Sequence, residues 1–499
     1  MMYLRAGVFS LGLLLLSRVL GLLRESAQAA AFGSTGLGDA VIVMFTLPDL
    51  LVGVLISSAL SYVLLPVWAN QTPSTLAAGQ KRVAYALLGS GFALGALVWL
   101  FRHALVQALA PGLSAELKAL SAASLGWSAL ALPLAMLAAL WVTRLQHERD
   151  FVGMYAGNLI VNVALVVGLV VVTKIAAPEM PALTVLGVCL VMAMLGRLAW
   201  LAWRLPRRLQ PTSAVQSTAL PPANVWLWAA LSSGLLLVFP LVARSLASSA
   251  GEGALASFNY AWKLIELPLV LAVQLVASLA FPAMTRTEAG SPGRQQAVGL
   301  AFLVAWALAC AAVAVVATFS WPIAGLLFGW GRMSAASLQM IGEWSAIGIW
   351  SLLPQALMAV LLTVMATTGR MQAAVWVMVA GLAALLGVGW LGSLSGVNAG
   401  AGVMWLLNAV FAGMAGALLL LERRSIAGSF SIVACLPPLL VCGALVTLKP
   451  LLGGLSLFVN VLGGAIFALV VVCSAVLASP ALRSLLKAKF KPPSPIACP

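Results

Sequence analysis

The stretch VFSLGLLLLSRVLGLLRESAQAAAF, residues 8–32, carries two arginines in a segment that is otherwise apolar enough to cross a bilayer. A charge at the centre of such a segment costs about 2.5–3.5 kcal/mol on insertion scales, and chains keep one mainly where it lines a cavity or a pathway. Arg18 lies near the middle of the stretch and Arg24 six residues further on. We therefore interpret both as functional residues of a membrane protein.

The composition supports a membrane fold. The chain has 499 residues, of which 63% are hydrophobic and 8% are charged. Soluble domains carry about 25% charged residues, so a soluble fold is excluded. A bilayer-spanning helix needs about 20 mostly apolar residues, and scanning for such runs predicts an all-α, polytopic membrane helix bundle with about 14 transmembrane helices.

The net charge of +15 would suggest nucleic-acid binding in a soluble protein, but here it indicates topology. Cytoplasmic loops of membrane proteins collect Lys and Arg. Most of the 27 such residues fall in loops on the side of the N-terminus. We therefore expect a multi-pass protein with both termini in the cytoplasm and no nucleic-acid partner.

The longest polar connection, residues 204–224, is basic and then rich in Pro, Ser and Thr, as a linker between two halves would be. Secondary transporters often bind their substrate between two such halves. We expect an N-terminal six-helix lobe (1–203), a cytoplasmic linker (204–224), a C-terminal six-helix lobe (225–421), two appended helices (422–482) and a basic cytoplasmic tail (483–499).

Further charges lie in or beside the apolar runs. Lys263 and Glu266 are three residues apart, so they are neighbours on one helical face. Glu25 follows Arg18 by seven residues, nearly on the same face, and Asp39 begins the second apolar run. We assign substrate binding to Arg18, Arg24 and Lys263, and supporting roles to Glu25, Asp39 and Glu266.

Arginine presents a planar fork of donors suited to phosphate, and lysine adds a point charge, so these residues could clamp a pyrophosphate. Two alternatives stay open: Lys263 and Glu266 form only a structural pair, and Arg18 reaches the membrane interface. Arg197 and Arg244, close to span ends, favour a structural interpretation.

Other function classes find less support in the sequence. There is no G-x-x-x-x-G-K-[ST] loop, so the chain should not hydrolyse ATP. Its 12 acidic residues are scattered, whereas a membrane enzyme would need clustered carboxylates for metal or acid–base chemistry. A cationic-drug exporter would offer acidic residues to its cargo. We expect no enzyme activity, no catalytic residues, no cofactor and no metal site.

Several motifs carry a resemblance to a known family. They are Ser17-Arg18-Val19-Leu20-Gly21-x-x-Arg24-Glu25, then Phe32-Gly33, Asp39-Ala40, Phe45-x-Leu47-Pro48-x-Leu50-Leu51, Pro66, and Tyr260-Ala261-Trp262-Lys263-Leu264-Ile265-Glu266-Leu267-Pro268. This pattern resembles the MurJ/MviN family, the bacterial lipid II flippases of the multidrug/oligosaccharidyl-lipid/polysaccharide exporter superfamily.

The resemblance implies a function. It implies a flippase of the bacterial inner membrane that moves undecaprenyl-pyrophosphate-linked saccharide from the inner to the outer leaflet by alternating access. Arg18, Arg24 and Lys263 would be cavity residues, and a hydrophobic groove formed by the two extra helices would receive the lipid tail. Cell-wall synthesis enzymes would be candidate partners in peptidoglycan biosynthesis and cell shape.

The chain departs from the family pattern at several positions. Val52 and Gly53 stand where the family often has basic residues, Ile56 where it has an acidic one nearby, and Lys263 where it has arginine. These differences leave two alternatives open: a flippase for another polyprenyl-linked polysaccharide repeat unit, or a degenerate paralogue that binds lipid without moving it.

Overall fold

The structure is a computed structural model, and every regular element in it is a helix within the described residues. These are residues 2–54, 59–69, 71–175, 178–205, 221–274, 291–391, 399–429, 431–452 and 456–489, together with positions 276, 280, 284, 287 and 454. Helices are expected in lipid because they satisfy their own backbone hydrogen bonds. The predicted all-α fold class is thus confirmed.

Membrane-spanning length is common among these helices. Eleven helical stretches of the described chain are long and apolar enough to cross a membrane, and Leu60–Ala69 and Val433–Thr447 are shorter apolar helices. The N-terminal helix α1 (Met2–Phe32) is separate from those eleven. The chain is a multi-pass membrane protein, and the count of about 14 spans stays a prediction.

The chain divides into two compact units. Unit 1 comprises Met1–Tyr260, Leu327–Leu338 and Val388–Gly400, and unit 2 comprises Ala261–Leu326, Gln339–Gly387 and Ala401–Pro499. Most of the expected linker, residues 206–220, lies outside the described residues. The predicted boundaries of the two six-helix lobes therefore stay a prediction.

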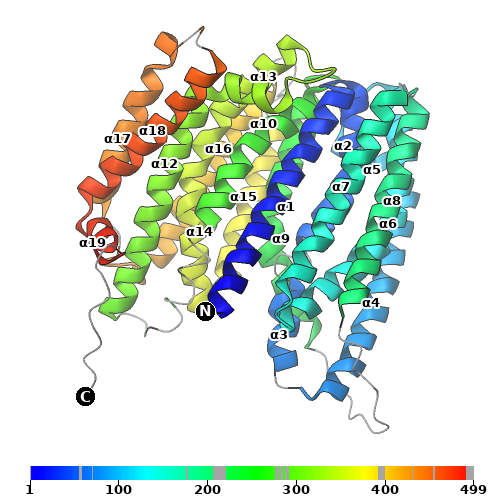
Figure 1. Ribbon diagram of the computed structural model, residues 1–499, viewed down its shortest axis with the longest axis horizontal. Helices are drawn as coiled ribbons and strands as arrows, with labels where there is room; N and C mark the ends of the chain where they lie inside the picture. The colour runs from blue at the N-terminus through cyan, green and yellow to red at the C-terminus, as the bar shows by residue number, and fades with distance from the viewer. Residues whose placement is uncertain are drawn as a thin grey trace. The chain divides into compact units, whose positions relative to one another are not determined.

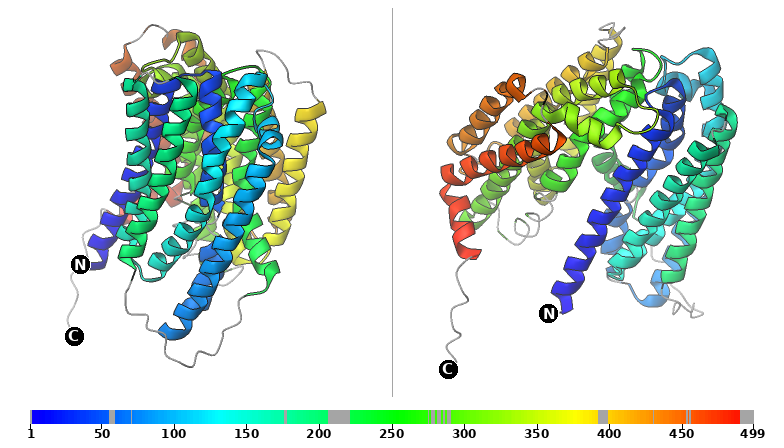
Figure 2. Two further views of the ribbon diagram at one scale, coloured as in Figure 1. Left: turned by 90° about the vertical axis from the view of Figure 1, so that its right-hand side faces the viewer. Right: turned by 45° about the horizontal axis from the view of Figure 1, so that its top comes forward.

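Most of the closely packed helix pairs in unit 1 are not consecutive in the chain. Its helices after α1 are α2 (Gly36–Val54), α3 (Leu60–Ala69), α4 (Pro73–Leu100), α5 (Arg102–Leu109), α6 (Ala115–His147), α7 (Phe151–Ile175), α8 (Glu179–Arg204), α9 (Ala223–Ser248) and the start of α10 (Ala254–Pro268). Helix α6 contacts α2, α4 and α8, while α1 runs along α7 (Figures 1 and 2).

Small residues allow this close packing. A Cβ at Gly91 or Gly95 of α4 would lie 2.6 Å from Pro133 Cα or 2.7 Å from the Ala129 carbonyl oxygen of α6. Two glycines four residues apart make a smooth face along one side of the helix, the arrangement that lets membrane helices approach closely.

Unit 2 continues through helices that are interrupted more often. After α10 come the π-helix Leu269–Gln274, α12 (Pro292–Phe328), α13 (Ala335–Gly348), the 3₁₀ turn Ile349–Ser351, α14 (Leu352–Thr367), α15 (Met371–Leu391), α16 (Ala399–Glu422), α17 (Ile432–Thr447), the 3₁₀ turn Lys449–Leu452, α18 (Leu457–Ala478) and α19 (Pro480–Lys489). Proline at the end of α10 removes a backbone donor, and the π-helix begins directly after it.

The two appended helices, α17 and α18, pack against each other (Figure 1). The Phe467 ring of α18 meets Phe319 of α12 edge-on, with ring centroids 5.2 Å apart. Helix α19 then occupies the first part of the expected tail; it starts with proline at its first position and continues with Ala, Leu, Arg and Lys, which favour helix. Residues 490–499 lie outside the described residues.

Candidate functional site

Arg24 of α1 is the centre of a buried ionic cluster in unit 1. Its Nη2 donates to Glu25 Oε1 at 2.9 Å and to Asp49 Oδ2 of α2 at 3.2 Å. The Arg24 side chain is 12% exposed, and its Nε has no hydrogen-bond partner in the described part of the chain. Two carboxylates offset the buried charge, while one donor is left for a further acceptor.

Glu25 extends this cluster to a second arginine. The amide of Asn259 on α10 donates to Glu25 Oε2 at 3.1 Å, and Arg244 of α9 donates to Asn259 Oδ1 at 2.8 Å. Helix α1 is thereby joined through side chains to α9 and α10, which lie far from it in the sequence. A carboxylate held from two sides keeps its position, so Glu25 orients the Arg24 guanidinium.

Asp39 has a different task from the arginine partners. It is fully buried in the first turn of α2, and its two oxygens accept from the backbone N–H groups of Gly253 at 2.8 Å and Ala256 at 2.7 Å. Gly253 directly precedes α10 and Ala256 lies in its first turn, where backbone N–H donors have no partner within the helix. Asp39 therefore caps α10, and it does so at the positive end of the helix dipole.

Lys263 and Glu266 of α10 form an ion pair in unit 2, as their spacing predicts. Lys263 Nζ donates to Glu266 Oε2 at 2.8 Å, and both side chains are about one-third exposed or less. Lys263 lies one helical turn after Asn259 on the same helix. The prediction that Arg24 and Lys263 face one chamber stays a prediction, because these side chains belong to different units.

Arg18 and Arg197 complete the picture of unit 1. Arg18 is exposed, and its charge acts on the Tyr155 hydroxyl of α7. Arg197 of α8 is only 2% exposed, although its place near a span end favoured a structural interpretation. The sequence analysis did not single out Asn259; the signal that could have found it is a polar amide one helical turn before Lys263.

The chain matches a known protein family over most of its length. The sequence model described as "Lipid II flippase MurJ" matches residues 28–452. The chain belongs to the lipid II flippase MurJ family. This confirms the resemblance drawn from the motifs around Arg18, Arg24 and Lys263, and it places the chain in a family of transporters, which is not an enzymatic class.

Two individual members of the MurJ family are also similar to this chain. The chain is 25% identical to the lipid II flippase MurJ of Burkholderia cenocepacia over 358 residues, 66% of this chain and 67% of that protein. A probable lipid II flippase MurJ of Rickettsia prowazekii is 32% identical over 109 residues, which span only 20% of that protein and 22% of this chain.

The fold has solved counterparts. A lipid II flippase MurJ in an inward closed conformation matches with a TM-score of 0.78 at 15% identity, covering 96% of this chain and 100% of the other. An inward-facing multidrug resistance MATE family transporter matches with a TM-score of 0.64 at 14% identity, covering 82% and 94%. At such identities these matches show the fold.

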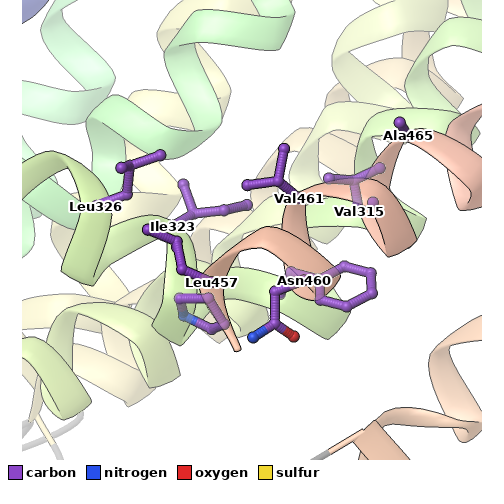
Figure 3. Close-up of a pocket in the computed structure, with 10 residues that line it drawn as sticks. Val315, Ile323, Leu326, Leu457, Asn460, Val461 and Ala465 are labelled. Atoms are coloured by element: carbon purple, nitrogen blue, oxygen red, sulfur yellow. The ribbon is translucent and has the colours of Figure 1, made fainter. Parts of the chain in front are cut away.

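An apolar groove lies between α12 and α18 in unit 2, as Figure 3 shows. Ten side chains line it: Val315, Phe319, Pro322, Ile323, Leu326, Leu457, Asn460, Val461, Gly464 and Ala465. Asn460 is the one polar member of this lining. One wall of this groove is the appended helix α18 and the other is α12, so the groove that the resemblance implies between the two appended helices stays a prediction.

We expect Asp39→Asn to destabilise the protein by about 1–3 kcal/mol, because the buried cap loses its charge and turns an amide NH2 donor toward one of the two backbone N–H donors. Thermal unfolding of the purified chain in detergent measures this. Glu252→Gln is the matched control, since it removes a negative charge from an exposed position just before α10. Equal melting temperatures for the two variants would contradict the capping role.

Proposed function

We propose that this MurJ family member flips an undecaprenyl-pyrophosphate-linked saccharide, lipid II, and that Arg24 binds the diphosphate. The observation that carries the proposal is the Arg24 guanidinium, whose buried Nε has no partner among the described residues while Nη2 contacts two carboxylates. A guanidinium binds phosphate oxygens through parallel N–H donors, and the low dielectric of a bundle interior strengthens that attraction.

The remaining predicted residues have distinct tasks in this proposal. Arg18 and Lys263 add positive charge from α1 and α10, and Glu266 holds the Lys263 ammonium. Glu25 orients Arg24, and Asp39 fixes the helix that carries Lys263. Alternating access between the two halves would carry the headgroup across the membrane, and cell-wall synthesis enzymes would supply or consume the cargo.

Arg24→Gln should abolish transport, because replacing the guanidinium by a neutral amide removes charge-assisted hydrogen bonds worth about 1.5–3 kcal/mol each. The measurement is complementation in bacteria depleted of their own lipid II flippase, with identification of the lipid-linked intermediate that accumulates. Lys263→Gln should have the same effect, and Arg24→Lys should restore part of the activity by keeping the charge.

The matched control is Arg102→Gln, which removes a partly exposed arginine that stacks 4.4 Å above the Trp99 ring. It should complement like the parent chain. Accumulation of lipid II supports the assignment, and accumulation of another saccharide-lipid supports the alternative cargo. Full complementation by Arg24→Gln would overturn the binding role and leave a lipid-binding paralogue as the better explanation.

We further propose that the groove between α12 and α18 holds part of the polyprenyl tail. Its lining is apolar except for Asn460. A hydrocarbon tail that leaves the surrounding lipid gains free energy there only where its shape fits the groove and allows close van der Waals contacts. Gly464→Leu would fill the groove, since a Cβ at this position already lies 3.4 Å from Val315 Cγ1.

We expect Gly464→Leu to lower complementation at least severalfold. Gly443→Leu on α17 adds the same bulk where a Cβ meets nothing within 4 Å, so it should leave transport unchanged. Protein amounts in the membrane are measured alongside both. Equal activity of the two variants would remove the groove from the proposal.

The excess of Lys and Arg in loops on the side of the N-terminus supports a location in the bacterial inner membrane with both ends in the cytoplasm. Alkaline phosphatase fused after residue 489 should be inactive, because it folds only outside the cytoplasm, and green fluorescent protein fused there should be fluorescent. The reverse pattern would place the C-terminus outside.

A further inference from the structure

Arg197 is a buried cation without adequate hydrogen bonding. Its side chain is 2% exposed on α8, and neither Nε nor Nη2 has a hydrogen-bond partner among the residues that the structure describes. Gly157 of α7 lies beside the stem, and a Cβ there would be in van der Waals contact with Arg197 Cγ at 3.5 Å. Leaving donors of a charged group unpaired costs about 1–3 kcal/mol or more, so this arrangement requires an explanation.

Asp49 is the carboxylate that can satisfy it. Helix α2 contacts α8, and the negative charge of Asp49 acts on the Arg197 guanidinium. At the same time Asp49 accepts a hydrogen bond from Arg24 at 3.2 Å, and its side chain is 50% exposed. The Asp49 carboxylate is half exposed, whereas the Arg197 side chain is buried. One carboxylate thus acts on two cations.

We propose that Asp49 changes partner when the cargo binds: the diphosphate replaces it on Arg24, and the carboxylate moves to Arg197. This inference rests on the proposed function, because it needs an anion that competes for Arg24. A diphosphate carries more charge than a carboxylate and presents several oxygens to the guanidinium fork, so it is the stronger ligand. Arg24 keeps Glu25 at 2.9 Å throughout.

Arg197 is then a positioning residue that never touches the cargo. It makes the displaced state of Asp49 favourable, since the carboxylate exchanges one guanidinium for another. Without Arg197 the displaced carboxylate loses its partner, and binding weakens. Without the charge of Asp49 there is no competitor on Arg24, so binding strengthens and Arg197 no longer matters.

A double-mutant cycle tests this exchange. The full chain is placed in nanodiscs, and affinity for farnesyl diphosphate, a short polyprenyl diphosphate, is measured for the parent, Arg197→Gln, Asp49→Asn, the double variant and Arg24→Gln. We expect Arg197→Gln to weaken binding about tenfold, Asp49→Asn to strengthen it, and the double variant to match Asp49→Asn, because loss of one charge-assisted hydrogen bond has about that effect.

Arg204→Gln is the control on the same helix: seven residues on, it removes an arginine that pairs with Asp150 at 2.7 Å, and it should bind like the parent. Arg197→Met keeps the bulk, and melting temperatures show that each variant is folded. If Arg197→Gln and Arg197→Met fail to fold, tighter binding by Asp49→Asn supports the exchange and unchanged or weaker binding overturns it.

Two failures are distinguishable. If parent and Arg24→Gln bind farnesyl diphosphate equally, the proposed function fails, and the partner exchange fails with it. A second outcome is that Arg24→Gln weakens binding, but Arg197→Gln weakens it equally in the parent and in the Asp49→Asn background. Arg197 would then act only through packing, so the exchange is overturned while the proposed function stands.

Discussion

The burial of Arg24 among apolar helices is the constraint on which the rest of unit 1 depends. A guanidinium at that depth is tolerated because Glu25 and Asp49 offset its charge at 2.9 and 3.2 Å. Glu25 is in turn held in place by the side-chain amide of Asn259. The Arg24 Nε has no hydrogen-bond partner among the residues described, and this remaining donor allows the site to accept an anion.

Asp39 shows how a buried charge is stabilised without an oppositely charged side chain. Its carboxylate is fully buried, yet two backbone N–H donors and the positive end of α10 stabilise it. The residues that it caps are more than 200 positions away in the chain. The cap therefore links the start of α2 to the start of the helix that carries Asn259 and Lys263, and a local helix end becomes part of the site's framework.

Sequence reasoning reached the fold class because hydropathy and the need for internally satisfied backbones leave few alternatives. It also reached the Lys263–Glu266 pair, since spacing on one helix is a local property. It could not reach the roles of Asp39 or Arg197, because both depend on which helices pack together. The exact number of spans could not be predicted either, because hydropathy does not show where one apolar run changes its type of helix. After Pro268, for example, α10 gives way to a π-helix.

A carboxylate resting on the binding arginine also bears on selectivity. A cluster of buried cations without a carboxylate would attract any small anion, opposed only by the free-energy cost of removing that anion from water. With Asp49 already on Arg24, an incoming ligand must outcompete a carboxylate, which a singly charged anion does poorly and a diphosphate does well. Discrimination then arises from the ligand that the protein itself provides, a form of selection against wrong partners. Two Arg197 donors have no partner among the described residues, so they can accept the displaced Asp49 carboxylate as a hydrogen-bond acceptor.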